Sequence, residues 1–294
     1  MIGLKKAVIP AAGLGIRLLP ATKEQPKEML PVFSRLSNGT LCVKPFLQLV
    51  FENLYDIGFN EFCFIVGRGK RSIEDHFTID PTLMEHLSRN NREDLLEELG
   101  SFYRKVSQCN IVFVNQPEPM GFGNAVFQAR HFTGNESFMV HAGDDLIVSK
   151  NNTCLRRLIK TFEDHHPDAL LFVKEVEDPQ RYGVIKGQKM NKDMYCVESI
   201  EEKPLVPISN LAIIAVYTFS PNIYASIEET VPDLGGEIQL THAIQSLIEE
   251  GHSVYALELK SNEKRIDIGT PESYRNILRT MRFPVPKTDN DLSC

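Results

Sequence analysis

The sequence lacks the features that mark several large classes of protein. Its six cysteines include no CxxC pair, which argues against a zinc cage or a thioredoxin-type motif and favours reduced thiols. No apolar run approaches the roughly 20 residues that span a bilayer, and no N-terminal run joins basic residues to an apolar core and a cleavage site. Acidic residues outnumber basic ones by 39 to 32, which argues against a broad electropositive face for nucleic acid. We therefore expect a cytoplasmic protein without a membrane or nucleic-acid partner.

The chain does contain enough apolar sequence to bury a substantial core. It has 294 residues, of which 42% are hydrophobic. No repeat, low-complexity segment or linker forces a domain boundary. We expect a single domain over residues 1–281, with halves of about 1–150 and 151–281, followed by a loose tail over 282–294.

Short apolar runs alternate with helical patterns through the first half. AVIPA, FCFIV and NIVFVN are typical of parallel strands that are buried on both faces, and amphipathic segments such as 45–57 separate them. This alternation predicts βαβ units, with ligands at the carboxyl ends of the strands. In the second half we expect helices over 153–165, 236–251 and 271–281, strands at ALLFVKEV, NLAIIAVYTF and VYALEL, and β-rich stretches around YGVIKG and YCVESIEEKP.

Two insertions interrupt this pattern. Residues 80–105 are charged and helix-prone with an apolar stripe, which predicts a packed helical pair whose charges form a solvated face. Residues 34–43 centre on SNGT, which is typical of a hairpin tip. The sequence leaves the purpose of both insertions open.

A glycine-rich turn follows the first apolar run, and Arg17, Lys23 and Lys27 come soon after it. Small residues let backbone N–H groups approach an anion closely, and the cations can neutralise a polyphosphate. The turn matches neither a Walker loop, which ends in GK[ST], nor the dinucleotide fingerprint, because Leu18 stands where a third glycine is needed. A purely structural turn is the alternative, but the cations favour a site for a nucleoside triphosphate.

The stretch GLGIRLLPATKEQPKEMLP closely resembles the signature of the sugar-1-phosphate nucleotidyltransferase family, and its PKEMLP ending is most similar to that of the bacterial-type uridylyltransferases. The family implies a Rossmann-like three-layer α/β/α fold with a mixed central sheet and a small β-rich sugar-binding region. Ile16 stands where the family usually has threonine, which puts one hydroxyl contact to the triphosphate in doubt. The resemblance implies these roles: nucleotide-binding backbone at Ala11, Ala12, Gly13 and Gly15, pyrophosphate contact by Arg17, phosphate contact by Lys27, and a place near the sugar nucleotide for Glu28.

Two aspartates follow apolar runs in the sequence. Asp144 comes after FMVHAG, and Asp267 lies in RIDIGTP. Attack of one phosphate on another brings two anions together, so their negative charge must be offset. Mg²⁺ can do this while bound by only one or two carboxylates, because it keeps several water ligands. Each aspartate alone is more often a helix cap or turn residue. Together they resemble the metal-binding aspartates of the family, which implies Mg²⁺ as the cofactor.

The segment VNQPEPMGFGNAV sets Gln116 at a strand end and opens a helix with glycines. An amide side chain can donate and accept at once, as the edge of a pyrimidine requires. The segment resembles the uridine-binding part of the family, which implies that Gln116 and Gly121 contact the base. Uracil and thymine differ by one methyl group, worth only about 1–3 kcal/mol, so the choice between them stays open.

Three further pieces, RYGVI, EEKP and SNLAI, occur in the order that the family shows. An EKP alone is an ordinary turn, but its place between YGV and NLA favours a sugar site. A carboxylate can accept hydrogen bonds from sugar hydroxyls, and a lysine can neutralise a 1-phosphate. GEIQLTHAI also matches the family, except that His242 replaces the usual aspartate, and we assign that histidine no role. The resemblance implies sugar contacts from Gly183, Glu202, Lys203 and Asn210, with Glu237 as a further candidate.

The motifs run in the family's order from about Lys5 to Tyr274. The resemblance therefore implies a catalyst that makes UDP-glucose and pyrophosphate from UTP and glucose 1-phosphate, with Mg²⁺. A thymidylyltransferase on the same scaffold and a non-catalytic nucleotide-sugar sensor are the alternatives. Whether the chain forms a homo-oligomer is left open.

Overall fold

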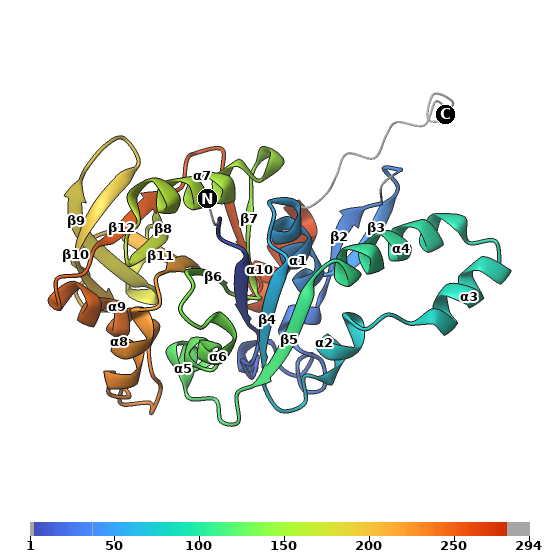
Figure 1. Ribbon diagram of the computed structural model, residues 1–294, viewed down its shortest axis with the longest axis horizontal. Helices are drawn as coiled ribbons and strands as arrows, with labels where there is room; N and C mark the ends of the chain where they lie inside the picture. The colour runs from blue at the N-terminus through green and yellow to red at the C-terminus, as the bar shows by residue number, and fades with distance from the viewer. Residues whose placement is uncertain (1–2, 37, 281–294) are drawn as a thin grey trace.

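The computed structural model describes residues 3–36 and 38–280 and is built on one mixed β-sheet (Figure 1). Pairing gives the strand order β5-β4-β1-β6-β11-β8-β12-β10-β9. The expected tail over 282–294 lies outside the described residues. The bounds of these nine strands are β1 (Lys6–Pro10), β4 (Glu61–Val66), β5 (Asn110–Asn115), β6 (Phe138–His141), β8 (Ala169–Glu175), β9 (Gly183–Lys189), β10 (Met194–Glu202), β11 (Leu211–Phe219) and β12 (Val254–Glu258).

Parallel pairing confirms the expected βαβ units of the first half. Strand β1 pairs in parallel with β4 and β6, and β4 pairs in parallel with β5. Every residue of β1 is buried: the apolar run from Ala7 predicts this for four of them, and Lys6 is buried as well. Strand β11 then runs antiparallel to both β6 and β8, which makes the sheet mixed.

Helices cover both faces of the sheet and make three layers (Figure 1). One buried cluster joins the sheet to α1 (Phe46–Asp56), α4 (Glu93–Ser107) and α7 (Thr153–His165). The cluster on the other face includes α5 (Gly121–Phe127), α8 (Ile223–Glu229) and α9 (Leu240–Glu249). The remaining helices are α2 (Arg71–His76), α3 (Pro81–Arg89), α6 (Arg130–Thr133) and α10 (Pro271–Thr280), with 3₁₀ turns η1 (Ile16–Leu18), η2 (Lys27–Met29), η3 (Lys150–Asn152) and η4 (Pro179–Arg181).

Aromatic packing holds the first half together. The ring of Phe51 in α1 lies 4.8 Å from that of Phe62 and 5.2 Å from that of Phe77. Phe102 of α4 meets Phe51 edge to face at 6.0 Å. Each buried phenylalanine contributes about 1.5–3 kcal/mol, which offsets the entropy of ordering the elements that carry it.

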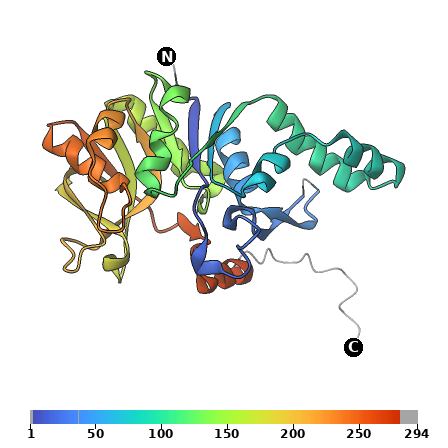
Figure 2. The same cartoon turned by 90° about the horizontal axis from the view of Figure 1, so that it is seen from below.

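Both insertions form the predicted structures. Helices α3 and α4 make an arm that projects away from the sheet (Figure 2), and α3 begins where the Asp80 side chain accepts a hydrogen bond from Leu83 N. Strands β2 (Pro31–Arg35) and β3 (Leu41–Pro45) form the antiparallel hairpin. No described helix is both long and apolar enough to cross a bilayer.

The expected helix over 236–251 is wrong at its start, because α9 begins only at Leu240. The four preceding residues form a loop whose backbone pairs elsewhere: Ile238 N donates to Met120 O, and Gly123 N donates to Ile238 O, both at 2.8 Å. These contacts with the start of α5 stabilise the loop and compete with helical hydrogen bonds.

A small second sheet of β7 (Asp145–Val148) and β13 (Lys264–Asp267) brings the end of the chain back to the centre.

Candidate active site

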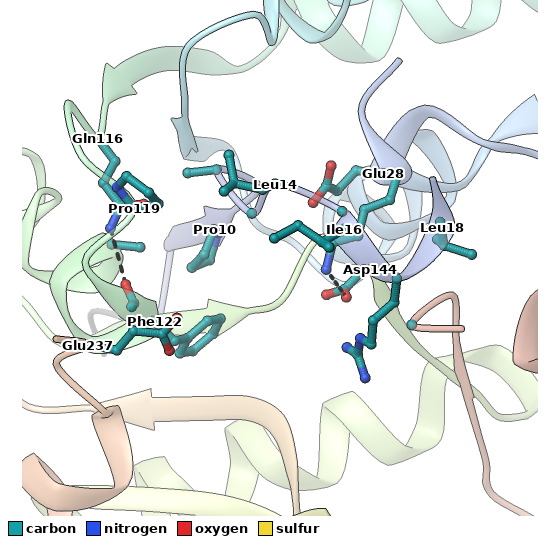
Figure 3. A pocket seen from close by; sticks show the side chains of 18 of the residues that line it. Pro10, Leu14, Ile16, Leu18, Glu28, Gln116, Pro119, Phe122, Asp144 and Glu237 are labelled. Atoms are coloured by element: carbon teal, nitrogen blue, oxygen red, sulfur yellow. Dashed lines mark hydrogen bonds and ion pairs between the residues drawn. The ribbon is translucent and has the colours of Figure 1, made fainter. Parts of the chain in front are cut away.

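A cavity of about 710 Å³ opens at the carboxyl ends of the parallel strands (Figure 3). Figure 3 shows Gln116, Pro119 and Phe122 on one side of it, and Glu28 and Asp144 on the other. Gly183, Glu202, Asn210, Ala11 and Asp267 do not line the cavity. The predicted residues that do line it are Ala12, Gly13, Gly15, Arg17, Lys27, Glu28, Gln116, Gly121, Asp144, Lys203 and the further candidate Glu237.

The glycine-rich turn forms the floor of one end. Ala11 N donates to Ile65 O at 2.8 Å, which continues the β1–β4 pairing into the turn and keeps Ala11 buried. Gly15 has a φ of 66°, a left-handed conformation that glycine adopts readily. A Cβ atom at Gly13 would lie 3.7 Å from Lys27 Nζ, so the lysine ammonium lies directly over the turn. This geometry suits an anion held between backbone and ammonium.

Lys27 bridges the turn to the end of β6. Its Nζ lies 2.5 Å from Asp144 Oδ2. Burial disfavours both charges, but the pairing outweighs it: Asp144 and Glu28 raise the pKa of Lys27, and Lys27 lowers the pKa of Asp144. Both groups are therefore charged at neutral pH.

The two predicted metal ligands lie at the ends of paired strands, because Asp144 immediately precedes β7 and Asp267 is the last residue of β13. Ile268 N donates to Asp144 O at 3.1 Å, and Asp267 is the pairing partner of Asp145. Asp267 Oδ2 accepts a hydrogen bond from Gly269 N, and Gly269 lines the cavity. Residues that are 123 positions apart in sequence thus meet at one end of the small β7–β13 sheet.

Arg265 neutralises this acidic cluster and was not found by sequence reasoning. Its Nε donates to both carboxylate oxygens of Asp145, at 2.9 and 2.8 Å. Asp145 is only 2% exposed, and burial raises its pKa to about 6 even though Arg265 opposes that shift. The guanidinium also lies 5.6 Å from the Tyr182 ring. The only sequence signal was an arginine two positions before Asp267, which did not reveal its partner.

The side chain of Gln116 has a defined orientation. Its Nε2 donates to Gly121 O at 3.1 Å and to Asn124 Oδ1 at 2.9 Å. Because a backbone carbonyl only accepts hydrogen bonds, the amide nitrogen must face Gly121, and Oε1 is left as an acceptor. Gly121 has a φ of 91°, and a Cβ there would lie 2.8 Å from Ile238 O, so only glycine fits this approach.

The predicted sugar residues come from the β-rich region. Thr241 Oγ1 donates to Glu202 Oε2 at 3.0 Å, and a Cβ on Gly183 would lie 3.0 Å from the same oxygen. Lys203 has a φ of 41°, a strained conformation for a side chain of this kind, and its Nζ lies 3.1 Å from Glu202 Oε1. Asn210 is exposed, and its carbonyl accepts from Val176 N. Sequence reasoning missed Thr241.

Comparison with known proteins identifies relatives of this chain by sequence and by structure. A family model described as nucleotidyl transferase matches residues 6–282. The chain is 39% identical to the UTP–glucose-1-phosphate uridylyltransferase of Bacillus subtilis, over 95% of this chain and 91% of the relative. It is 37% identical to that of Pseudomonas aeruginosa, over 92% of this chain and 93% of the relative.

A solved structure of UDP-glucose pyrophosphorylase complexed with UDP-glucose is also similar. It has a TM-score of 0.81 and 31% sequence identity, and the match covers 94% of this chain and 98% of that one. Agreement in sequence and in fold over nearly the whole length confirms the resemblance drawn from the motifs. The chain therefore belongs to the nucleotidyl transferase family.

Proposed function

We propose that this chain transfers the uridylyl group of UTP to glucose 1-phosphate and releases pyrophosphate. The observation that carries the proposal is the convergence in one cavity of an oriented amide, a glycine turn, three cations and a carboxylate. The names of the relatives support the choice of both substrates. The lining residues that combine these functions are Gln116, Gly13, Arg17, Lys27, Lys203 and Asp144.

The free acceptor on Gln116 supports a uracil or thymine base. Gln116 Nε2 is occupied by Gly121 O and Asn124 Oδ1, so Oε1 is left to accept from the imide N–H of the base. Cytosine has a lone pair at that position and would place two acceptors against each other. Discrimination of this kind is strong, because a site built to make one hydrogen bond leaves a polar group unpaired with the wrong ligand.

In this proposal Arg17, Lys27 and the glycine turn bind the triphosphate. A phosphate oxygen of glucose 1-phosphate attacks the α-phosphorus of UTP, the new P–O bond forms, and the bond to the β-phosphate breaks. The electron pair leaves with pyrophosphate, whose added charge Arg17 offsets. Lys203 holds the attacking 1-phosphate, and its strained backbone is consistent with a residue placed for function.

Asp144 and Asp267 fit a divalent cation, which we propose is Mg²⁺. Among the described residues, no group of three or more His, Cys, Asp or Glu side chains could hold a metal ion by itself. Two carboxylates at neighbouring strand ends nevertheless suit Mg²⁺, which completes its shell with waters and substrate phosphates. When bound, the ion supplies positive charge at the transferring phosphate.

The test is pyrophosphate release measured over a panel of nucleoside triphosphates and sugar 1-phosphates. We expect UTP with glucose 1-phosphate to give the highest kcat/KM. A preference for dTTP would instead favour a thymidylyltransferase, and binding of UTP without turnover would favour a sensor. Chelation of divalent cations should abolish turnover, and added Mg²⁺ should restore it.

A further inference from the structure

Three of the four parallel strands of the first half lead to residues that line the cavity, and the segment after β4 has no role in the proposed function. The turn after β1 carries the glycines, β5 leads to Gln116, and β6 leads to Asp144. Strand β4 leads to the segment Gly67–Lys70, which does not line the cavity. Lys70 is nevertheless buried there, with 8% of its side chain exposed.

Lys70 reaches the cavity wall through one partner. Its Nζ lies 3.0 Å from Glu28 Oε2, and the Glu28 side chain is 1% exposed. The segment is held tightly, since a Cβ on Gly67 would lie 2.9 Å from Ala12 O and Lys70 N donates to Gly67 O at 3.2 Å. The ammonium therefore approaches Glu28 from behind the glycine turn.

The four charged groups form a row of alternating sign, in the order Lys70, Glu28, Lys27, Asp144. Lys70 neutralises Glu28 on one side, and Lys27 bonds Asp144 on the other. Without Lys70, the buried carboxylate of Glu28 would have only Lys27 as a cationic neighbour and would draw that ammonium away from Asp144. Alternatively Glu28 would take up a proton, because burial raises its pKa and Lys70 is the largest opposing influence.

We propose that Lys70 is a positioning residue for this reaction: it keeps Glu28 charged and in place, so that Lys27 stays between Asp144 and the phosphate site. This inference rests on the proposed function. Lys70 does not line the cavity and acts only through Glu28. A buried ion pair is in general weak support for stability, so its place at the cavity wall points to position rather than to fold strength.

A double-mutant cycle tests this role. The variants Lys70→Met, Glu28→Gln and the double variant are compared by kcat and KM in the pyrophosphate-release assay, and by UTP affinity. We expect Lys70→Met alone to lower kcat/KM by about 10-fold or more, as expected when a hydrogen bond to a charged group is lost. In the Glu28→Gln background the same change should alter kcat/KM by less than about 2-fold, because the partner is already gone. Lys70→Arg keeps the charge and should recover much of the loss.

Lys44 provides a matched control. It is buried to the same degree, at 8% exposed, and pairs with Glu52 at 3.2 Å and with Glu98, away from the cavity. Lys44→Met should lower thermal stability yet leave kcat/KM of the folded enzyme unchanged.

Two outcomes would overturn the Lys70 proposal. One is that Lys70→Met lowers kcat/KM as much in the Glu28→Gln background as it does in the wild type. The other is that Lys70→Met and Lys44→Met lower kcat/KM equally. Failure of the wild-type chain to release pyrophosphate would count against the proposed function instead. In that case the double-mutant cycle would use UTP affinity, whose measurement needs no turnover. If Lys70→Met and Glu28→Gln then changed UTP affinity additively, the role of Lys70 would still be overturned.

Discussion

Replacement of Gln116 by alanine should change which nucleotide the enzyme prefers more than it changes the fold. The side chain is 5% exposed and leaves one acceptor for the base. Loss of that hydrogen bond removes about 0.5–1.5 kcal/mol from the UTP complex, which corresponds to roughly a 2- to 12-fold fall in kcat/KM. In the wild type, CTP places a ring nitrogen lone pair against Gln116 Oε1, and leaving such a buried polar group unpaired costs about 1–3 kcal/mol. Gln116→Ala removes this cost, so the CTP complex should become more stable.

The two effects act in opposite directions, so the ratio of kcat/KM for UTP over CTP should fall by about 10-fold or more. Pyrophosphate release with each nucleotide, at fixed glucose 1-phosphate, measures this ratio. Gln128→Ala is the matched control, because Gln128 Nε2 contacts the same Asn124 Oδ1 at a weaker 3.5 Å. An unchanged ratio in Gln116→Ala, with normal folding, would refute the assigned orientation and the base-recognition role.

Three further outcomes follow from the site and its surroundings. Asp144→Ala or Lys203→Ala should each lower kcat by at least about 10²-fold, and near-normal turnover of either purified variant would remove that residue from the mechanism. Arg265→Gln leaves the Asp145 carboxylate buried without its partner and should cost about 3 kcal/mol in urea unfolding, with recovery when Asp145→Asn is added; absence of recovery would contradict the pairing. Burial lowers the pKa of His141 to about 4 in the folded chain, against about 6.5 in the unfolded chain. As the pH falls, the unfolded chain therefore takes up this proton first, and the free energy of unfolding should fall by roughly 3 kcal/mol between pH 6.5 and pH 4. The slope of unfolding free energy against pH should flatten in His141→Gln, and an unaltered slope would argue against this histidine.

The strands of the main sheet, the glycine turn and the order of the motifs can be predicted from local sequence. The strand of AVIPA, the helix over 153–165 and the arm over 80–105 were predictable because apolar periodicity and turn residues act over short distances. The phosphate-binding role of the turn after β1 is a prediction of the same local kind, since small residues and nearby cations lie within a few positions of each other. The resemblance to one family then followed from motifs rather than from any single residue.

Which charged side chains form ion pairs could not be predicted from the sequence. Lys27 and Asp144 are 117 positions apart, Arg265 and Asp145 are 120 apart, and Lys70 and Glu28 are 42 apart. No local pattern specifies such pairs, because sheet order and loop packing bring them together. The late start of α9 at Leu240 has the same cause: backbone contacts with the start of α5 outweigh a helical pattern that the local sequence supports. Local propensity is a preference of about 1 kcal/mol or less per residue, and long-range contacts of this kind can override it.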